Sequence, residues 1–288
     1  MLLRTASPLA SIAEKVQAGE RLSFDDGMQL YASNDVLAMG KLADTVNRRM
    51  NGDIVYYVQN HRITPTNVCA FHCNFCSFRR NGNEADAFVR TPEQIIEHVA
   101  KLHSDRTREF HIVGGVVPDL DIEYYAEMIH QLKVKYPEIH VKAFTAVEID
   151  YMAQISGIGW RETLTILRDA GLDALPGGGA EIFAPAVRRK ICPEKVDGDG
   201  WLEIHAIAHE LGIKTNATML YGHIETAEQR VDHLLQLRDQ QDKTGGFVTY
   251  IPLAFHPENN NLARAKGLDW TTGFEDLKNL AIGRLLLD

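Results

Sequence analysis

Cysteine is scarce in this chain. The 288 residues include four cysteines, too few and too clustered to hold a domain of this size together by disulfide bonds. Long apolar runs are also missing, since no stretch approaches the roughly 18 residues of a membrane span. The N-terminus lacks the charged and apolar regions of a signal peptide. We therefore expect a protein of the reducing cytoplasm, without a membrane span.

Basic clusters are rare as well. The chain has 30 Lys and Arg against 39 Asp and Glu, a net charge of −9, and its basic runs are short, such as residues 79–80 and 188–190. Nucleic-acid-binding proteins usually have such clusters on one face, so we expect no nucleic-acid partner. With 45% hydrophobic and 24% charged residues, the composition is typical of a globular enzyme.

Three of the four cysteines, Cys69, Cys73 and Cys76, have the spacing C-x3-C-x2-C. This spacing predicts three thiolate ligands to one [4Fe–4S] cluster. Clusters that only transfer electrons usually have four cysteine ligands, so a loop with three predicts one iron that is open to another ligand. Cys192 lies far downstream and is expected to pack as a small hydrophobic residue.

Two alternatives for this loop are a zinc knuckle and a four-ligand electron carrier. Zinc would need a fourth ligand nearby, and His72 is the only candidate inside the loop, with little room to reach a metal there. A second pair, His205 and His209, is one helical turn apart, but no carboxylate completes an H-E-x-x-H motif. We expect that pair to lie on an amphipathic helix.

The cysteine loop resembles the signature C-x3-C-x-aromatic-C of the radical S-adenosylmethionine (SAM) superfamily, with Phe75 at the aromatic position. The resemblance implies that the amine and carboxylate of SAM bind the fourth iron. It also implies that an electron from the reduced cluster cleaves SAM to a 5′-deoxyadenosyl radical. The cofactors supply this reactivity, and the protein positions them.

From about residue 62, short apolar runs alternate with helical patterns, which predicts an α/β fold with a parallel sheet. We expect a partial radical SAM TIM barrel of six βα units, or a (β/α)8 barrel if the chain continues, because the last helix has no stop signal. Threonines at 91, 226 and 272 stand three residues before Gln or Glu, which predicts helix caps. The expected strands are 62–68, 109–114, 140–147, 173–176, 214–221 and 247–255.

Residues 1–61 are predicted to form a helical extension packed on the barrel of residues 62–288. A helix is expected to begin at Ser23 to Asp26 and to end at Asn51 and Gly52. A short apolar run, 54–58, follows it.

Parallel barrels carry their active sites at the carboxyl ends of the strands. The candidate cofactor-binding residues after successive strands are Phe75, Gly114 and Gly115, Thr145 and Glu148, Glu181, and Gly222. By the resemblance, the glycine pair binds the methionyl amine and the segment at Gly222 contacts adenine. Glu181, also a candidate catalytic residue, can accept hydrogen bonds from ribose or the ammonium group. His256 is a candidate proton donor, or a residue that binds a substrate carboxylate. Residues 188–190 are expected to form a solvated helix end. If the substrate has carboxylates, Arg79, Arg80, Arg188, Arg189 and Lys190 are candidates to bind them.

Longer segments resemble the aminofutalosine synthases of the futalosine route to menaquinone. These segments are 61–67, 176–183, 215–225 and 251–260. The resemblance implies addition of the adenosyl radical to 3-[(1-carboxyvinyl)oxy]benzoate, giving 6-amino-6-deoxyfutalosine with loss of bicarbonate. It implies a small-molecule substrate with carboxylates, SAM consumed as co-substrate, and an unidentified one-electron reductant. The alternatives are cyclic dehypoxanthinyl futalosine synthase and the related enzymes of deazaflavin-cofactor synthesis.

Overall fold

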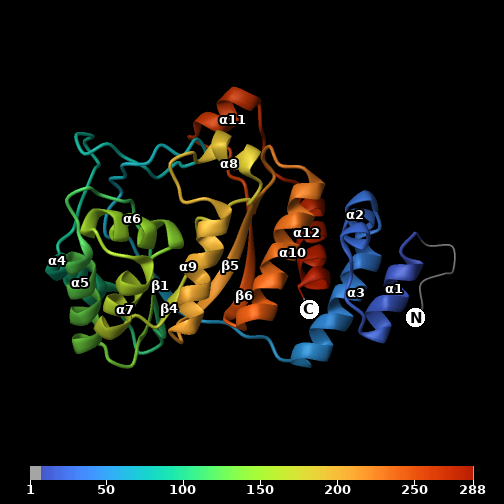
Figure 1. Cartoon of the computed structure of the whole chain (residues 1–288), viewed down its shortest axis with the longest axis horizontal. Coiled ribbons are helices and arrows are strands. Elements are labelled where there is room, and N and C mark those ends of the chain that lie inside the picture. Colours follow the sequence, from blue (N-terminus) through green and yellow to red (C-terminus); the bar gives the residue numbers. More distant parts are fainter. Residues whose placement is uncertain (1–7, 288) are drawn as a thin grey trace.

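The computed structural model describes residues 8–287, and its centre is a sheet of six parallel strands (Figure 1). Each strand pairs with the next one along the chain, and no pairing joins the first strand to the last within the described residues. The sheet is therefore an open half-barrel, which confirms the predicted fold class. The strands are β1 (Asn60–Ile63), β2 (Glu109–Ile112), β3 (His140–Ala143), β4 (Ala174–Leu175), β5 (Lys214–Tyr221) and β6 (Phe247–Ala254).

Helices follow every strand, and the longer ones cover the outer face of the sheet (Figure 1). The helices that follow the strands are α4 (Pro92–Leu102), α5 (Ile122–Lys135), α6 (Ala146–Ser156), α7 (Trp160–Ala170), α8 (Pro185–Ile191), α9 (Gly198–Glu210), α10 (Ala227–Thr244), α11 (Asn261–Lys266) and α12 (Gly273–Leu286). The main core lies between sheet and helices and includes the fully buried Ile63, Phe110 and Trp201. Within residues 8–287, no helix is both long enough and apolar enough to cross a membrane.

Five of the six strands differ from the predicted bounds, and the largest differences are at the ends of the first and third strands. The first strand ends at Ile63 rather than at residue 68, because Pro65 has no N–H to donate to a sheet ladder. The third strand ends at Ala143 rather than at residue 147, because Thr145 caps the next helix with its hydroxyl. The predicted caps at Thr91 and Thr226 form reciprocal capping boxes, whereas Thr272 accepts one hydrogen bond, from the Glu275 N–H.

The N-terminal part consists of three helices, α1 (Ala10–Ala18), α2 (Phe24–Ala32) and α3 (Val36–Asn51). The prediction of one helix from residue 23 to 51 was wrong, because the chain leaves the helix at Ser33 and Asp35 caps a new one through the Ala38 N–H. These helices pack against α10 and α12 beside β6 (Figure 1). Residues 54–58 have no regular structure, and their apolar side chains are exposed. The division into domains at residue 61 stays a prediction.

Candidate active site

A cavity of about 590 Å³ lies at the carboxyl ends of the first four strands. Its wall brings together residues from four separate loops, as the strand-end argument predicts. The predicted site residues that line it are Cys69, Cys73, Cys76, Phe75, Gly114, Gly115, Thr145, Glu148 and Glu181. Gly222 and His256 do not line it.

Backbone hydrogen bonds hold the cysteine loop in place from two sides. The Ala70 N–H donates to the carbonyl of Val116 at 2.8 Å, in the loop after β2. The Asn74 N–H donates to the carbonyl of Ile191 at 2.8 Å, at the end of α8. The three cysteines are half-buried and free of disulfide bonds, so the loop presents its thiols to the cavity from a fixed backbone.

The donor set fits an iron–sulfur cluster better than a single zinc ion. Within residues 8–287, no group of three or more His, Cys, Asp or Glu side chains is arranged to hold one metal ion. A cube can bind more widely spaced thiolates, because each of them binds a different iron. His72, the candidate fourth zinc ligand, is exposed, and its ring nitrogens face Glu194 at 3.3 Å and Arg79 at 2.7 Å. The cavity wall therefore provides three cysteine ligands.

The glycine pair after β2 is required by the cysteine loop itself. A Cβ atom on Gly115 would stand 2.0 Å from the carbonyl oxygen of Val68 and 2.9 Å from the Cβ of Cys69. The Gly115 N–H donates to the carbonyl of Thr66 at 3.0 Å. Any larger residue at this position would displace the backbone that carries the first cysteine.

Glu148 is buried in the first turn of α6 with both carboxylate oxygens occupied. One oxygen accepts the Gly114 N–H at 3.0 Å, and the other accepts the backbone N–H and the hydroxyl of Thr145 at 2.7 and 2.8 Å. Burial raises the pKa of Glu148 to about 7, and these hydrogen bonds offset only part of the increase. Glu148 thus joins the helix cap to the glycine turn in addition to lining the cavity.

Glu181 is buried in the loop after β4 and has a cationic partner. The Lys195 ammonium lies 2.7 Å from its carboxylate and 5.1 Å from the centre of the Phe75 ring. Burial alone would raise the pKa of Glu181, but the Lys195 charge, with help from Arg188, outweighs burial and lowers it. The backbone of Glu181 is left-handed at φ 44°, an unusual conformation for a residue with a side chain. This carboxylate is therefore charged and held in one orientation at the cavity wall.

Lys195 was not among the residues predicted from the sequence. It follows Cys192 in a short charged segment with no recognisable motif, and only the fold places it opposite Glu181. The same pair of charges could not be assigned from spacing alone.

The predicted solvated helix end at residues 188–190 is partly wrong. Arg189 and Lys190 are exposed as predicted, but the Arg188 side chain is buried. Its guanidinium donates to the carbonyl oxygens of Gly179 at 3.2 Å and Ala180 at 2.6 Å, which fixes the glycine-rich loop that leads to Glu181. Arg188 can be buried because backbone carbonyls pair with both of its terminal nitrogens, although its Nε has no hydrogen-bond partner.

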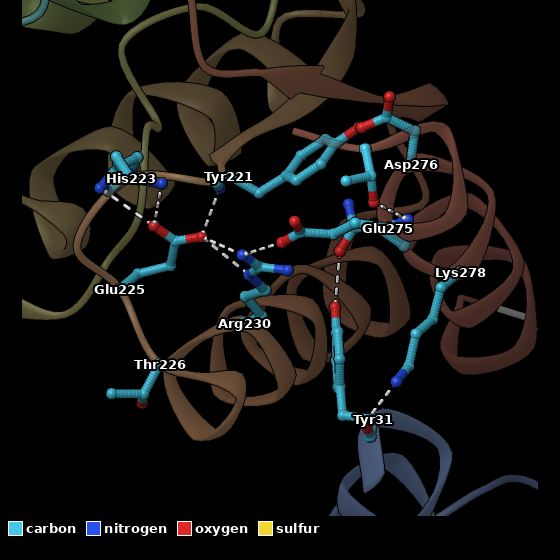
Figure 2. A network of polar contacts seen from close by, with 12 residues as sticks. Tyr31, Tyr221, His223, Glu225, Thr226, Arg230, Glu275, Asp276 and Lys278 are labelled. Atoms are coloured by element: carbon cyan, nitrogen blue, oxygen red, sulfur yellow. Dashed lines mark hydrogen bonds and ion pairs between the residues drawn. The ribbon is translucent and has the colours of Figure 1, made fainter. Parts of the chain in front are cut away.

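Gly222 lies in the loop after β5, next to a network of charged residues that includes Glu225, Arg230 and Glu275 (Figure 2). Its N–H donates to Glu225 at 2.6 Å, and Arg230 of α10 bridges Glu225 at 2.6 Å and Glu275 of α12 at 2.9 Å. Figure 2 shows Tyr31 of α2 reaching the same group of helices. This loop is therefore tied to α10 and α12.

His256, Cys192 and the histidine pair lie outside the cysteine cavity. His256 is exposed after β6, with its ring 4.6 Å from that of Trp270. Cys192 is buried in a hydrophobic cluster, as predicted. His205 and His209 both contact the hydroxyl of Thr215 at 2.8 Å, which confirms a packing role on the helix face.

Sequence comparisons agree with this site. Residues 63–237 match the family profile described as the radical SAM superfamily. The chain is 48% identical over 281 residues to the aminodeoxyfutalosine synthase of Thermus thermophilus, covering 97% of this chain and 76% of that protein. It is 42% identical to the enzyme of the same name from Streptomyces coelicolor, covering 96% and 73%. It is also 37% identical to a 5-amino-6-(D-ribitylamino)uracil–L-tyrosine 4-hydroxyphenyl transferase of Methanopyrus kandleri, covering 98% and 78%.

Two solved structures share the fold at low sequence identity. Methylornithine synthase (PylB) superposes with a TM-score of 0.75 at 19% identity, covering 96% of this chain and 76% of that one. The hydrogenase maturase HydG from Carboxydothermus hydrogenoformans gives 0.76 at 19% identity, covering 97% and 63%. With the three cysteines on one cavity wall and the family match over most of the barrel, this chain belongs to the radical SAM superfamily, whose enzymes use a [4Fe–4S] cluster and SAM.

Proposed function

We propose that this enzyme is an aminodeoxyfutalosine synthase of menaquinone biosynthesis. In the proposed reaction, a reduced cluster held by Cys69, Cys73 and Cys76 would supply the electron that cleaves SAM to methionine and a 5′-deoxyadenosyl radical. Addition of that radical to the alkene of 3-[(1-carboxyvinyl)oxy]benzoate, with water, would give 6-amino-6-deoxyfutalosine and bicarbonate and return the electron. SAM is consumed as a co-substrate. The observation that carries this proposal is the 48% identity to the Thermus thermophilus enzyme across 97% of the chain.

The cavity residues would bind and orient SAM. Within the described residues, no hydrogen bond ends on the carbonyl oxygens of Gly114 and Gly115, which leaves them to accept from the methionyl ammonium. The carboxylate of Glu181, held by Lys195, can accept from the ammonium or from ribose hydroxyls. Phe75, Thr145 and Glu148 complete this part of the wall. Close placement of the nucleoside beside the alkene is what the protein contributes to the rate.

Two further roles concern loops beside the cavity. Gly222 would face the adenine, and His256 would donate a proton or bind a carboxylate. Because neither residue lines the cysteine cavity, both roles require the loops after β5 and β6 to contact the bound ligands. We also propose a location in the reducing cytoplasm, with an unidentified one-electron reductant as partner and no nucleic acid.

Product identification tests the proposal. The anaerobically reconstituted enzyme, reduced chemically, should convert SAM and 3-[(1-carboxyvinyl)oxy]benzoate to 6-amino-6-deoxyfutalosine, detected by mass spectrometry. A second candidate function is hydroxyphenyl transfer, because the chain is also similar to the Methanopyrus transferase. L-Tyrosine with 5-amino-6-(D-ribitylamino)uracil is the substrate pair that tests it. Dehypoxanthinyl futalosine tests for the cyclase. Product from either of these, without 6-amino-6-deoxyfutalosine, would contradict the proposal.

A further inference from the structure

A row of three basic side chains crosses the inner face of the sheet below the cysteine loop. Arg62 of β1 pairs in register with His111 of β2, and His111 pairs in register with Lys142 of β3. Each is the last residue but one of its strand. Side chains in register on neighbouring parallel strands point to the same face, so these three form one lateral row.

Alternation along the strands places this row opposite the helices. The residues that follow in each strand, Ile63, Ile112 and Ala143, are fully buried in the core under the helices. Successive side chains of a strand point to opposite faces. The basic row therefore faces the interior of the half-barrel, where Arg62 also lines the cavity that contains the cysteines.

The charges in this row are only partly neutralised. Glu109, two residues before His111, lies 2.7 Å from the Lys142 ammonium and 3.9 Å from the ring of His111. Within residues 8–287, the Arg62 side chain forms no hydrogen bond or ion pair, and its guanidinium lies over the Phe78 ring, 5.5 Å from the ring centre. Asn60 donates to Glu109 at 3.3 Å. One acid thus faces two permanent cations, so the row has a positive charge available to a ligand.

The far side of the same inner face is apolar. In β6, Tyr250 packs against the two hydrophobic clusters formed with the outer helices. Because successive side chains of a strand alternate between faces, Ile251 and Leu253 lie on the inner face. They are 37% and 43% exposed, and they pair in register with Thr218 and Leu220 of β5. A ligand that fills the half-barrel would meet cations from β1 to β3 and apolar side chains at β6.

Resting on the proposed function, we infer that the basic row at Arg62, His111 and Lys142 binds the ring carboxylate of an aromatic dicarboxylate substrate. The alkene must lie beside the nucleoside at the cysteine loop, so the carboxylate attached to it stays at the upper end of the cavity. The carboxylate on the ring then extends down the half-barrel to the row. A guanidinium forms strong, charge-assisted hydrogen bonds with a carboxylate, which makes Arg62 the main contact.

The test compares two ligands on matched variants of the reconstituted enzyme. The ligands are 3-[(1-carboxyvinyl)oxy]benzoate and 2-phenoxyacrylate, which lacks the ring carboxylate; binding is measured calorimetrically without reductant, so that no turnover occurs. The variants are Arg62→Gln, Arg62→Lys and the control Arg161→Gln, an exposed arginine of α7 that pairs with Glu210. Circular dichroism checks folding, and the EPR response to SAM checks the cofactor site.

Wild type and Arg161→Gln should bind the dicarboxylate roughly tenfold or more tightly than 2-phenoxyacrylate, as expected for a hydrogen-bonded charge pair. Arg62→Gln should lose this preference yet bind 2-phenoxyacrylate as wild type does, and Arg62→Lys should recover part of it. Product formed by wild type, together with an unchanged preference or an equal weakening of both ligands in Arg62→Gln, would overturn this inference alone. No product and no binding by wild type would overturn the proposed function and this inference with it.

Discussion

Two buried carboxylates line one cavity, yet their surroundings give them opposite electrostatic behaviour. In the loop after β4, Lys195 lowers the pKa of Glu181 against the effect of burial. At the cap of α6, burial raises the pKa of Glu148 to about 7, because its three hydrogen-bond donors and the more distant Lys195 charge do not outweigh burial. Hydrogen bonds from neutral groups therefore offset only part of the effect of burial on Glu148, whereas a directly paired cation outweighs burial at Glu181.

The largest effect is expected at the turn that joins the α6 cap to the cysteine loop. Gly115→Ala places a methyl group 2.0 Å from the Val68 carbonyl oxygen, so the loop must move and bound iron should fall to a small fraction of the wild-type amount. Iron analysis after anaerobic reconstitution measures this. Gly82→Ala, where an added Cβ meets no atom within 4 Å, is the control. Full iron content in Gly115→Ala would contradict the close packing.

The second largest effect is expected at the ion pair of Glu181 and Lys195. Lys195→Met leaves a buried carboxylate without its cation, which should lower the free energy of unfolding by about 3–5 kcal/mol. The double variant Lys195→Met with Glu181→Gln should recover most of this loss, because no buried charge is left unpaired. Denaturant unfolding under anaerobic conditions measures both. The exposed Lys190→Met is the control, and equal stability of Lys195→Met and wild type would contradict the pairing.

The Glu148 region should show a distinctive pH dependence. Its pKa is about 7 in the folded protein against an ordinary value of 4.5, so the folded state retains a proton that the unfolded state loses. As the pH rises from below 4.5 to above 7, the contribution of Glu148 to the free energy of unfolding therefore decreases by roughly 3 kcal/mol. Glu181, with its lowered pKa, acts in the opposite sense, since its contribution is lost as the pH falls.

Glu148→Gln should remove the Glu148 contribution to that slope. The measurement is the difference in unfolding free energy between wild type and variant from pH 4 to pH 8. Glu123→Gln, an exposed acid in the first turn of α5, is the control. A difference that stays constant across this range would show that Glu148 does not titrate in it.

Cys192→Ala should have the smallest effect. Cys192 is buried among apolar side chains, where a methyl group can replace the thiol, so we expect a loss of about 1 kcal/mol in unfolding free energy and unchanged iron content. Reduced iron in this variant would instead indicate that a fourth thiol holds metal.

Local signals in the sequence predicted much of the fold. Apolar runs placed all six strands, and Thr–x–x–Gln patterns placed the caps at Thr91 and Thr226. A threonine three residues before a Glu also occurs at Thr145 and Glu148. The capping pattern could therefore have predicted both the early end of β3 and the capping role of Glu148. The prediction of one helix over residues 23–51 failed because the polar segment 33–35 ends the first helix and Asp35 caps the next one.

The candidate site was predictable only in part. The cysteines and the strand-end residues follow from spacing and from the rule that parallel strands end at one edge. The partners of those residues do not, because Lys195 and Arg188 reach the loop of Glu181 through the path of α8 and the segment after it. The basic row at Arg62 depends on register between strands that are far apart in sequence.

The central claim is that three thiolates hold a cluster whose fourth iron is open. The most direct test is the EPR spectrum of the anaerobically reconstituted, reduced protein before and after SAM is added. We predict a clear change in the spectrum on addition, with no change in a Cys73→Ala variant that fails to assemble the cluster. A wild-type spectrum that SAM leaves unaltered, or a protein that holds zinc in place of iron, would contradict the account.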